Sequence, residues 1–177
     1  MSSTPRIYVA CLASYNNGIL HGKWIDCDQG VDAMQAEISA MLADSPTVGA
    51  EEWAIHADAN FCGITISENM DLDKVVEITE ALVEYEDVFV AAYNNFRHSY
   101  SIDYILDIVK YSYCGVYENL GAYAEEVLND SDSLNGVPHN LLKYFDYEEY
   151  GKDMELNGEI WTENVGYKRI HIFRGDV

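Results

Sequence analysis

Negative charge is spread along the whole of this chain, and that spread limits what the chain can fold into. Residues 1–67 carry eight acidic and two basic side chains, residues 68–112 carry ten and three, and residues 113–177 carry thirteen and five. The net charge of −21 over 177 residues is therefore not an acidic tail on a neutral domain. Self-repulsion of this size opposes compaction, so a fold needs enough apolar material to overcome it.

The apolar content meets that need. Hydrophobic residues make up 49% of the chain and aromatic residues 12%, with only three prolines, which is far more apolar material than a disordered polyelectrolyte carries. We therefore expect a folded protein whose acidity reflects either a halophilic habit or a surface that meets a basic partner.

The sequence predicts a cytoplasmic protein. No apolar run reaches the roughly 18 residues of a membrane span, and the N-terminus lacks the basic start and apolar core of a signal peptide. Cys11, Cys27, Cys62 and Cys114 stand singly, so we expect buried free thiols in a reducing compartment rather than disulfides or a metal site.

The pattern of residues 1–67 predicts a small β-sheet with one helix packed on it. The expected elements are strands over 6–15, 19–27 and 52–58 and a helix over 32–43. Asn17-Gly18 predicts a tight hairpin turn, because both positions of such a turn need positive φ. In the third strand, alternation places Trp53, Ile55 and Ala57 on one face.

Residues 68–112 have helical periodicity and predict a small helical domain. An apolar stripe predicts a helix over 71–87 that Asn69 or Asp71 would cap. A shorter helix over 88–98 follows, and Ser101 would cap a third helix over 102–110. The stripe consists of Leu72, Val75, Val76, Thr79, Leu82 and Val83.

Residues 113–177 predict a mixed α/β domain. The expected elements are helices over 117–128 and 138–145, a further helical turn over 146–150, and antiparallel strands over 154–163 and 167–174. The fold class predicted for the whole chain is therefore α+β, with a sheet-plus-helix domain, a helical middle domain and a mixed C-terminal domain.

Signatures of catalysis are absent from the sequence. It has no G-x-S-x-G elbow, no Walker loop, no G-x-G-x-x-G and no H-E-x-x-H, so we expect a non-enzymatic protein without a cofactor. Asp26, Asp28, Asp32 and Glu37 fall at positions 1, 3, 7 and 12 of a calcium loop, but Val31 occupies the sixth position, where the turn needs glycine. We expect no metal site there; a calcium-dependent acidic protein remains an alternative that calorimetry with calcium would test.

Acidic residues in the helix over 71–87 fall on the face opposite the apolar stripe. Glu77, Glu80 and Glu84 lie at i, i+3 and i+7, and like charges about 6 Å apart destabilise a helix by a few tenths of a kcal/mol. For this helix alone, an ordinary solvated face explains the pattern. Over the whole chain, however, the net charge matches that of roughly ten base pairs of duplex DNA, which carries one charge per ~1.7 Å of axis. A carboxylate array of this kind can imitate a DNA backbone.

Four stretches of the chain carry a family resemblance. They are PRIYVACLASYNNG at 5–18 with its continuation HGKWID at 21–26, YAEE at 123–126, YFDYEEYGKD at 144–153 and HIFR at 171–174. In these stretches the chain resembles the ArdA-type antirestriction proteins of plasmids, conjugative transposons and phages.

The resemblance implies an elongated protein of three small domains in a row that forms a homodimer through residues 113–177. It also implies a mimic of bent B-form DNA that binds no nucleic acid itself. Such a mimic occupies the DNA-binding groove of type I restriction–modification enzymes, at the methyltransferase core with its specificity subunit, and blocks restriction and modification. An acidic binding module for another basic DNA-binding protein, such as a nucleoid protein, is the alternative.

The resemblance supplies no catalytic residues, so the expected site is a partner-binding surface of carboxylates that stand in for phosphates. Its expected members are Glu77, Glu80, Glu84, Asp87, Asp103, Asp107, Glu118, Glu125, Glu126, Asp146, Glu148, Glu149 and Asp153.

Overall fold

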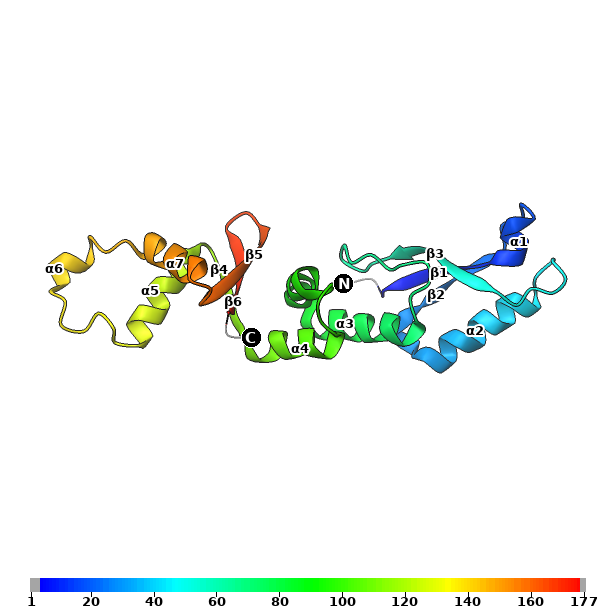
Figure 1. The fold of residues 1–177 in the computed structure, drawn as a ribbon, viewed down its shortest axis with the longest axis horizontal. Helices are drawn as coiled ribbons and strands as arrows, with labels where there is room; N and C mark the ends of the chain where they lie inside the picture. The colour runs from blue at the N-terminus through cyan, green and yellow to red at the C-terminus, as the bar shows by residue number, and fades with distance from the viewer. Residues whose placement is uncertain (1–3, 176–177) are drawn as a thin grey trace. The chain divides into compact units, whose positions relative to one another are not determined.

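The chain folds into helices and antiparallel strands in a computed structural model that describes residues 4–175 (Figure 1). The chain forms two compact units: unit 1 ends at Val90 and unit 2 begins at Ala91. The predicted α+β class is confirmed. The finer division into three domains, with boundaries near 67 and 112, stays a prediction.

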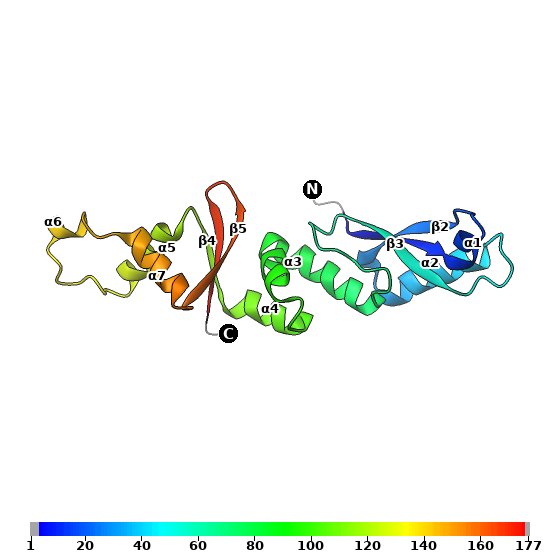
Figure 2. The ribbon, with the colours of Figure 1, turned by 45° about the horizontal axis from the view of Figure 1, so that its top comes forward.

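Unit 1 is built on a three-stranded antiparallel sheet of order β2-β1-β3. Helix α2 and the first part of α3 lie along the same side of this sheet (Figures 1 and 2). The elements in chain order are β1 (Arg6–Cys11), α1 (Leu12–Asn16), β2 (Gly22–Asp26), a 3-10 turn (Cys27–Gln29), α2 (Val31–Ala43), β3 (Trp53–Ala59) and the part of α3 (Leu72–Phe96) that ends at Val90.

The pairing of the first two strands is confirmed, but their connection is not the predicted tight turn. Strand β1 stops at Cys11, and the residues expected to continue it form the short helix α1. Ser14 in this helix is fully buried, and its hydroxyl lies 2.9 Å from those of Ser45 and Thr47, so polar contacts override the β propensity of the segment. Asn17 consequently has a φ of −88°, and the expectation of positive φ is wrong there.

A β-bulge alters the predicted face of β3. The register shifts between Tyr8 and Val9 of the neighbouring strand, whose partners are Ala57 and Ile55. The extra residue in β3 breaks the period-two alternation, so Ala57 is exposed while the adjacent residues Ala54 and Ile55 are both buried.

Helix α3 confirms the predicted pair of helices, because it is kinked at Glu86, where φ is 49° and ψ is −129°. The backbone N–H of Val75 donates to the carbonyl of Asp71, which places Asp71 at the helix start. The buried face of α3 differs from the predicted apolar stripe. Ile78, which the stripe omits, is fully buried, whereas Val83 is 67% exposed. The expectation that Val83 belongs to the core is therefore wrong.

Unit 2 is built on a second antiparallel sheet, of order β4-β6-β5. Figure 1 shows α5 and α7 on one side of this sheet. After the last residues of α3, its elements are α4 (Ile102–Tyr111), β4 (Tyr113–Tyr117), α5 (Leu120–Asp130), α6 (His139–Leu142), α7 (Tyr147–Leu156), β5 (Ile160–Gly166) and β6 (Arg169–Arg174).

Strand β6 holds unit 2 together by directing alternate side chains into two clusters. Ile172 packs with Tyr123 of α5 and Met154 of α7 on one face. On the other face, Phe173 stacks on its cross-strand neighbour Trp161, with ring centroids 4.0 Å apart. Such aromatic pairs across a sheet add stability beyond the area that they bury.

Several boundaries in unit 2 differ from the predicted ones. The segment 113–117 forms β4 and was not predicted as a strand, so α5 begins at Leu120 rather than at 117. Helix α7 continues to Leu156, which shortens the strand expected over 154–163. The predicted cap of α4 is confirmed, because the Ser101 hydroxyl accepts a hydrogen bond of 3.3 Å from the N–H of Tyr104.

All four cysteines are free thiols, as expected. Cys11 and Cys27 are buried, and burial raises the pKa of the Cys27 thiol to about 12. Cys114 is half-buried, whereas Cys62 is exposed. The expectation of burial is wrong for Cys62 because this residue lies in the turn after β3, where its φ is 53°.

Candidate partner-binding surface

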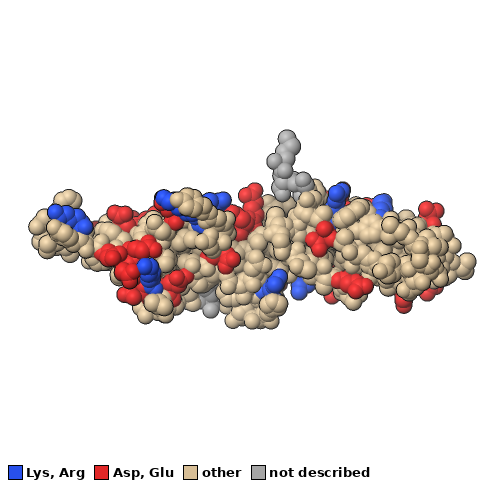
Figure 3. Space-filling model, turned by 90° about the horizontal axis from the view of Figure 1, so that it is seen from above, with Lys and Arg blue, Asp and Glu red and all other residues tan. Residues whose placement is uncertain are grey.

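Most of the predicted phosphate-mimicking acids lie at the protein surface. Eleven of the thirteen are exposed, and Asp87 and Glu148 are half-buried. In the view of Figure 3, acidic side chains occur on both units and are densest over α5 and α7. The net charge is larger in residues 1–90, which hold sixteen acids and three bases, than in residues 91–177, which hold fifteen and seven.

Seven of these carboxylates make no hydrogen bond or ion pair within the part of the chain that the structure describes. They come from four helices, where amphipathic periodicity turns one face of each helix to water. These seven residues, called here the free carboxylates, are Glu77, Glu80, Glu84, Asp103, Asp107, Glu125 and Asp153.

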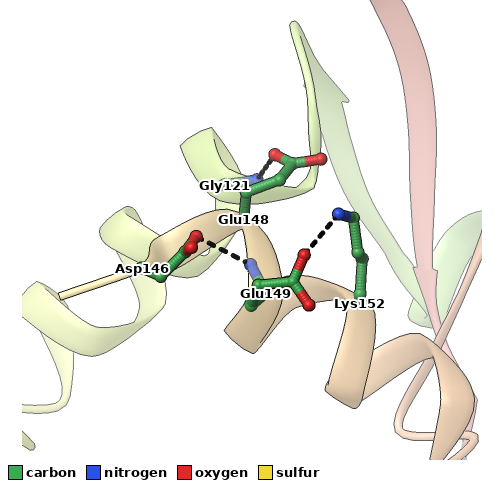
Figure 4. Close-up of polar contacts among 5 residues, drawn as sticks. All are labelled: Gly121, Asp146, Glu148, Glu149 and Lys152. Atoms are coloured by element: carbon green, nitrogen blue, oxygen red, sulfur yellow. Dashed lines mark hydrogen bonds and ion pairs between the residues drawn. The ribbon is translucent and has the colours of Figure 1, made fainter.

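Two other predicted acids lie at the beginning of α7, where they support the fold (Figure 4). The Asp146 carboxylate caps the helix by accepting a hydrogen bond of 3.1 Å from the N–H of Glu149. The Glu148 carboxylate accepts one of 2.8 Å from the backbone N–H of Gly121 in α5. Both acids satisfy N–H groups that a helix start leaves without an intrahelical partner.

Three more acids are engaged by neighbouring side chains. Glu149 forms an ion pair of 2.6 Å with Lys152, and this contact raises the pKa of the lysine (Figure 4). Glu118 forms an ion pair with Lys168. Glu126 accepts a hydrogen bond of 2.9 Å from the Tyr117 hydroxyl, whose pKa is raised to about 12 by burial and by this contact.

The spacing of acidic residues within one helix could not reveal the partners of these acids, because several of the partners come from distant parts of the chain. Lys168, for example, lies 50 residues from Glu118 in the sequence. The same patterns could have identified two exposed acids of α3 that the predicted set omits. Asp73 precedes Glu77 by one helical turn and extends its face, and Glu86 lies at the kink.

No calcium loop forms from the acids around residue 30. Asp26 ends a strand rather than a helix, and the Glu37 carboxylate lies 2.5 Å from the ammonium group of Lys23. Gln29 donates a further hydrogen bond of 2.8 Å to the same carboxylate. Over residues 4–175, no three His, Cys, Asp or Glu side chains come together as metal ligands.

The fold and surface define an acidic α+β protein with an array of exposed carboxylates along its helices. Within the described residues, no helix is both long enough and apolar enough to cross a membrane. The ArdA family model, described as antirestriction protein, matches residues 7–169. The chain therefore belongs to the ArdA family of antirestriction proteins, whose partner is a restriction–modification enzyme. A search of curated proteins found no match.

Proposed function

We propose that this chain is a DNA mimic that occupies the DNA-binding groove of type I restriction–modification enzymes and blocks both restriction and modification. The observation that carries the proposal is the set of free carboxylates, which lie on helices and have no ion-pair partner among residues 4–175. Their charge is available to a basic partner, as the charge of DNA phosphates is.

The spacing along α3 supports the mimicry. Glu77, Glu80 and Glu84 are exposed on one helix, and at about 1.5 Å rise per residue neighbouring members lie roughly 4.5 to 6 Å apart along its axis. A groove that reads the DNA backbone recognises regularly spaced negative charge. Carboxylates bound there release counterions from the enzyme and the inhibitor, but they offer no base to read and no phosphodiester bond to cut.

We also propose an oligomeric state and a cellular location for the protein. It acts as a non-enzymatic homodimer in the cytoplasm, where restriction enzymes meet incoming DNA, and residues 113–177 provide the dimer contact. Residues 113–177 expose large apolar side chains that such a contact would cover, including Tyr144 at 75%, Leu156 at 83% and Tyr167 at 89%. Sedimentation over a range of protein concentrations tests the dimer.

Competition with DNA tests the mimicry directly. Labelled duplex DNA is bound to a type I methyltransferase, and fluorescence anisotropy follows its release as this protein is added. We expect full release, with an apparent affinity that falls steeply as salt rises. DNA that stays bound in the presence of excess inhibitor contradicts the proposal. Specific binding to a nucleoid protein in that case would favour the alternative of a general acidic binding module.

A further inference from the structure

A cavity of 270 Å³ lies in unit 1 beside the kink of α3. Its lining includes both apolar and charged groups. Pro5, Leu82 and Val83 supply apolar surface, and Asp28 and Glu86 supply carboxylates. Val83, which helical periodicity assigns to the core, is 67% exposed. The cavity is therefore apolar on one part of its wall and negatively charged on another.

The kink of α3 places Glu86 in the wall of this cavity. At Glu86 the backbone has φ 49° and ψ −129°, a region of conformational space that favours glycine, and the regular helix that begins at Leu72 ends there. The carboxylates of Asp28 and Glu86 in the wall favour a cation as the occupant.

The two carboxylates are available to an external group. Asp28 and Glu86 are exposed, and neither forms an ion pair or hydrogen bond with any other residue in the described part of the chain. A small inorganic cation would use only the charged part of the wall. A lysine or arginine side chain uses both parts, because its methylene stem covers apolar surface while its charged end meets carboxylates.

We propose that this cavity receives an arginine or lysine side chain from the DNA-binding groove of the partner enzyme. The stem of that side chain packs against Leu82 and Val83, and its charged end lies between Asp28 and Glu86. This inference rests on the proposed function and sharpens it. One pocket anchors the inhibitor through apolar contact as well as charge, whereas the free carboxylates contribute many weak contacts.

Charge-removing variants test the anchor in the DNA-release assay with a type I methyltransferase. Asp28→Asn and Glu86→Gln keep the shape of the cavity and remove one charge each. The matched control is Glu51→Gln, which removes one charge from an exposed position of unit 1 outside the cavity. We expect each cavity variant to weaken inhibition about tenfold or more, as at a binding hot spot, and the control to weaken it less than about threefold.

The variant Glu86→Gly distinguishes the effect of the Glu86 charge on inhibition from the effect of its strained backbone on stability. Glycine relieves the positive φ, so this variant should unfold at a higher denaturant concentration than the wild type. It should still inhibit about as weakly as Glu86→Gln, because both lack the carboxylate. A glycine variant that inhibits like the wild type would show that the Glu86 charge contributes nothing, and the anchor would be rejected.

Alkylation of Cys62 provides a second readout, since its thiol is exposed and lines the cavity. Mass spectrometry after a short treatment with N-ethylmaleimide compares Cys62 with the half-buried Cys114 of unit 2. We expect the methyltransferase to slow modification of Cys62 several-fold. An unchanged rate at Cys62, or equal losses of inhibition in the cavity and control variants, overturns the inference but leaves the DNA mimic standing. A wild-type protein that releases no DNA overturns both.

Discussion

The carboxylate of Glu148 accepts a hydrogen bond of 2.8 Å from the backbone N–H of Gly121 and so joins α7 to the first turn of α5. Asn119 caps the same turn by accepting a hydrogen bond of 2.8 Å from the N–H of Ala122. Together these side chains accept hydrogen bonds from two of the N–H groups that have no intrahelical acceptor at the start of α5. An acid expected to face a partner thus holds two helices together, and it need not contact the enzyme to matter for inhibition.

Glu148→Ala should lower the free energy of unfolding by about 1–3 kcal/mol, because it leaves the Gly121 N–H without its acceptor. Urea denaturation measures the effect. Glu125→Ala, at an exposed position of α5 without such a contact, is the control and should change the free energy by less than about 0.5 kcal/mol. Equal effects of the two substitutions would show that the hydrogen bond does not stabilise the fold.

Gly151→Ala should also destabilise unit 2, although alanine normally favours a helix over glycine by about 1 kcal/mol. A Cβ at position 151 would lie 2.7 Å from the carbonyl oxygen of Leu120, so α5 and α7 would have to move apart. We expect a net loss of about 1–3 kcal/mol in urea denaturation. Asp153→Asn, at an exposed position of the same helix where the side chain makes no hydrogen bond or ion pair in the described part of the chain, is the neutral control. A gain in stability for Gly151→Ala would mean that the helices separate at no cost.

Glu37 should make a pH-dependent contribution to stability. The hydrogen bond from Lys23, followed by that from Gln29, lowers the pKa of this carboxyl in the folded state below its ordinary 4.5. The contribution is thus fully present above the unfolded-state pKa and is lost as the pH falls through the folded-state pKa. Glu37→Gln should cost less than about 1 kcal/mol near neutral pH, since water screens a surface pair. Urea denaturation at several pH values should show this cost shrinking below pH 4.5; a constant cost would contradict the linkage.

Neutralising the acidic residues on the exposed face of α3 should raise stability but weaken inhibition. The triple variant Glu77→Gln, Glu80→Gln and Glu84→Gln removes like-charge repulsion, so the free energy of unfolding should rise by a few tenths of a kcal/mol. Its release of DNA from a type I methyltransferase should nevertheless weaken more than the single variants do. The control triple Glu51→Gln, Glu52→Gln and Asp58→Asn removes the same charge elsewhere in unit 1. Equal losses of inhibition would mean that net charge alone matters.

Local patterns in the sequence predicted the elements whose contacts are mainly local. The helix over 32–43 and the cap at Ser101 are confirmed, and so is a break in α3 near residue 87. Strand β4 was missed because it is stabilised by pairing with β6, for instance Tyr113 with Phe173, and such distant pairing leaves no local signal. The exposure of Val83 was missed for a related reason: periodicity sets the spacing of a stripe, whereas packing decides how much of it is buried.

For the candidate surface, the sequence predicted which acidic residues are exposed but not which of them have partners within the fold. Helical spacing correctly placed Glu77, Glu80 and Glu84 in water. Spacing could not tell a free carboxylate from one with a structural partner, as for Glu126, which accepts a hydrogen bond from a tyrosine of β4. Which acids touch the enzyme stays a prediction.

The free carboxylates have a consequence for how such a chain can change over generations. Because their carboxylates make no hydrogen bond or ion pair in the described fold, polar contacts do not constrain where on a helix face each one lies. An acid can shift by one turn, or be exchanged between Asp and Glu, at little cost in stability. On the proposed mimicry, such a chain can redistribute its charge by single substitutions when the groove that it meets is rearranged, whereas folding constrains Glu148 and the glycines at 121 and 151.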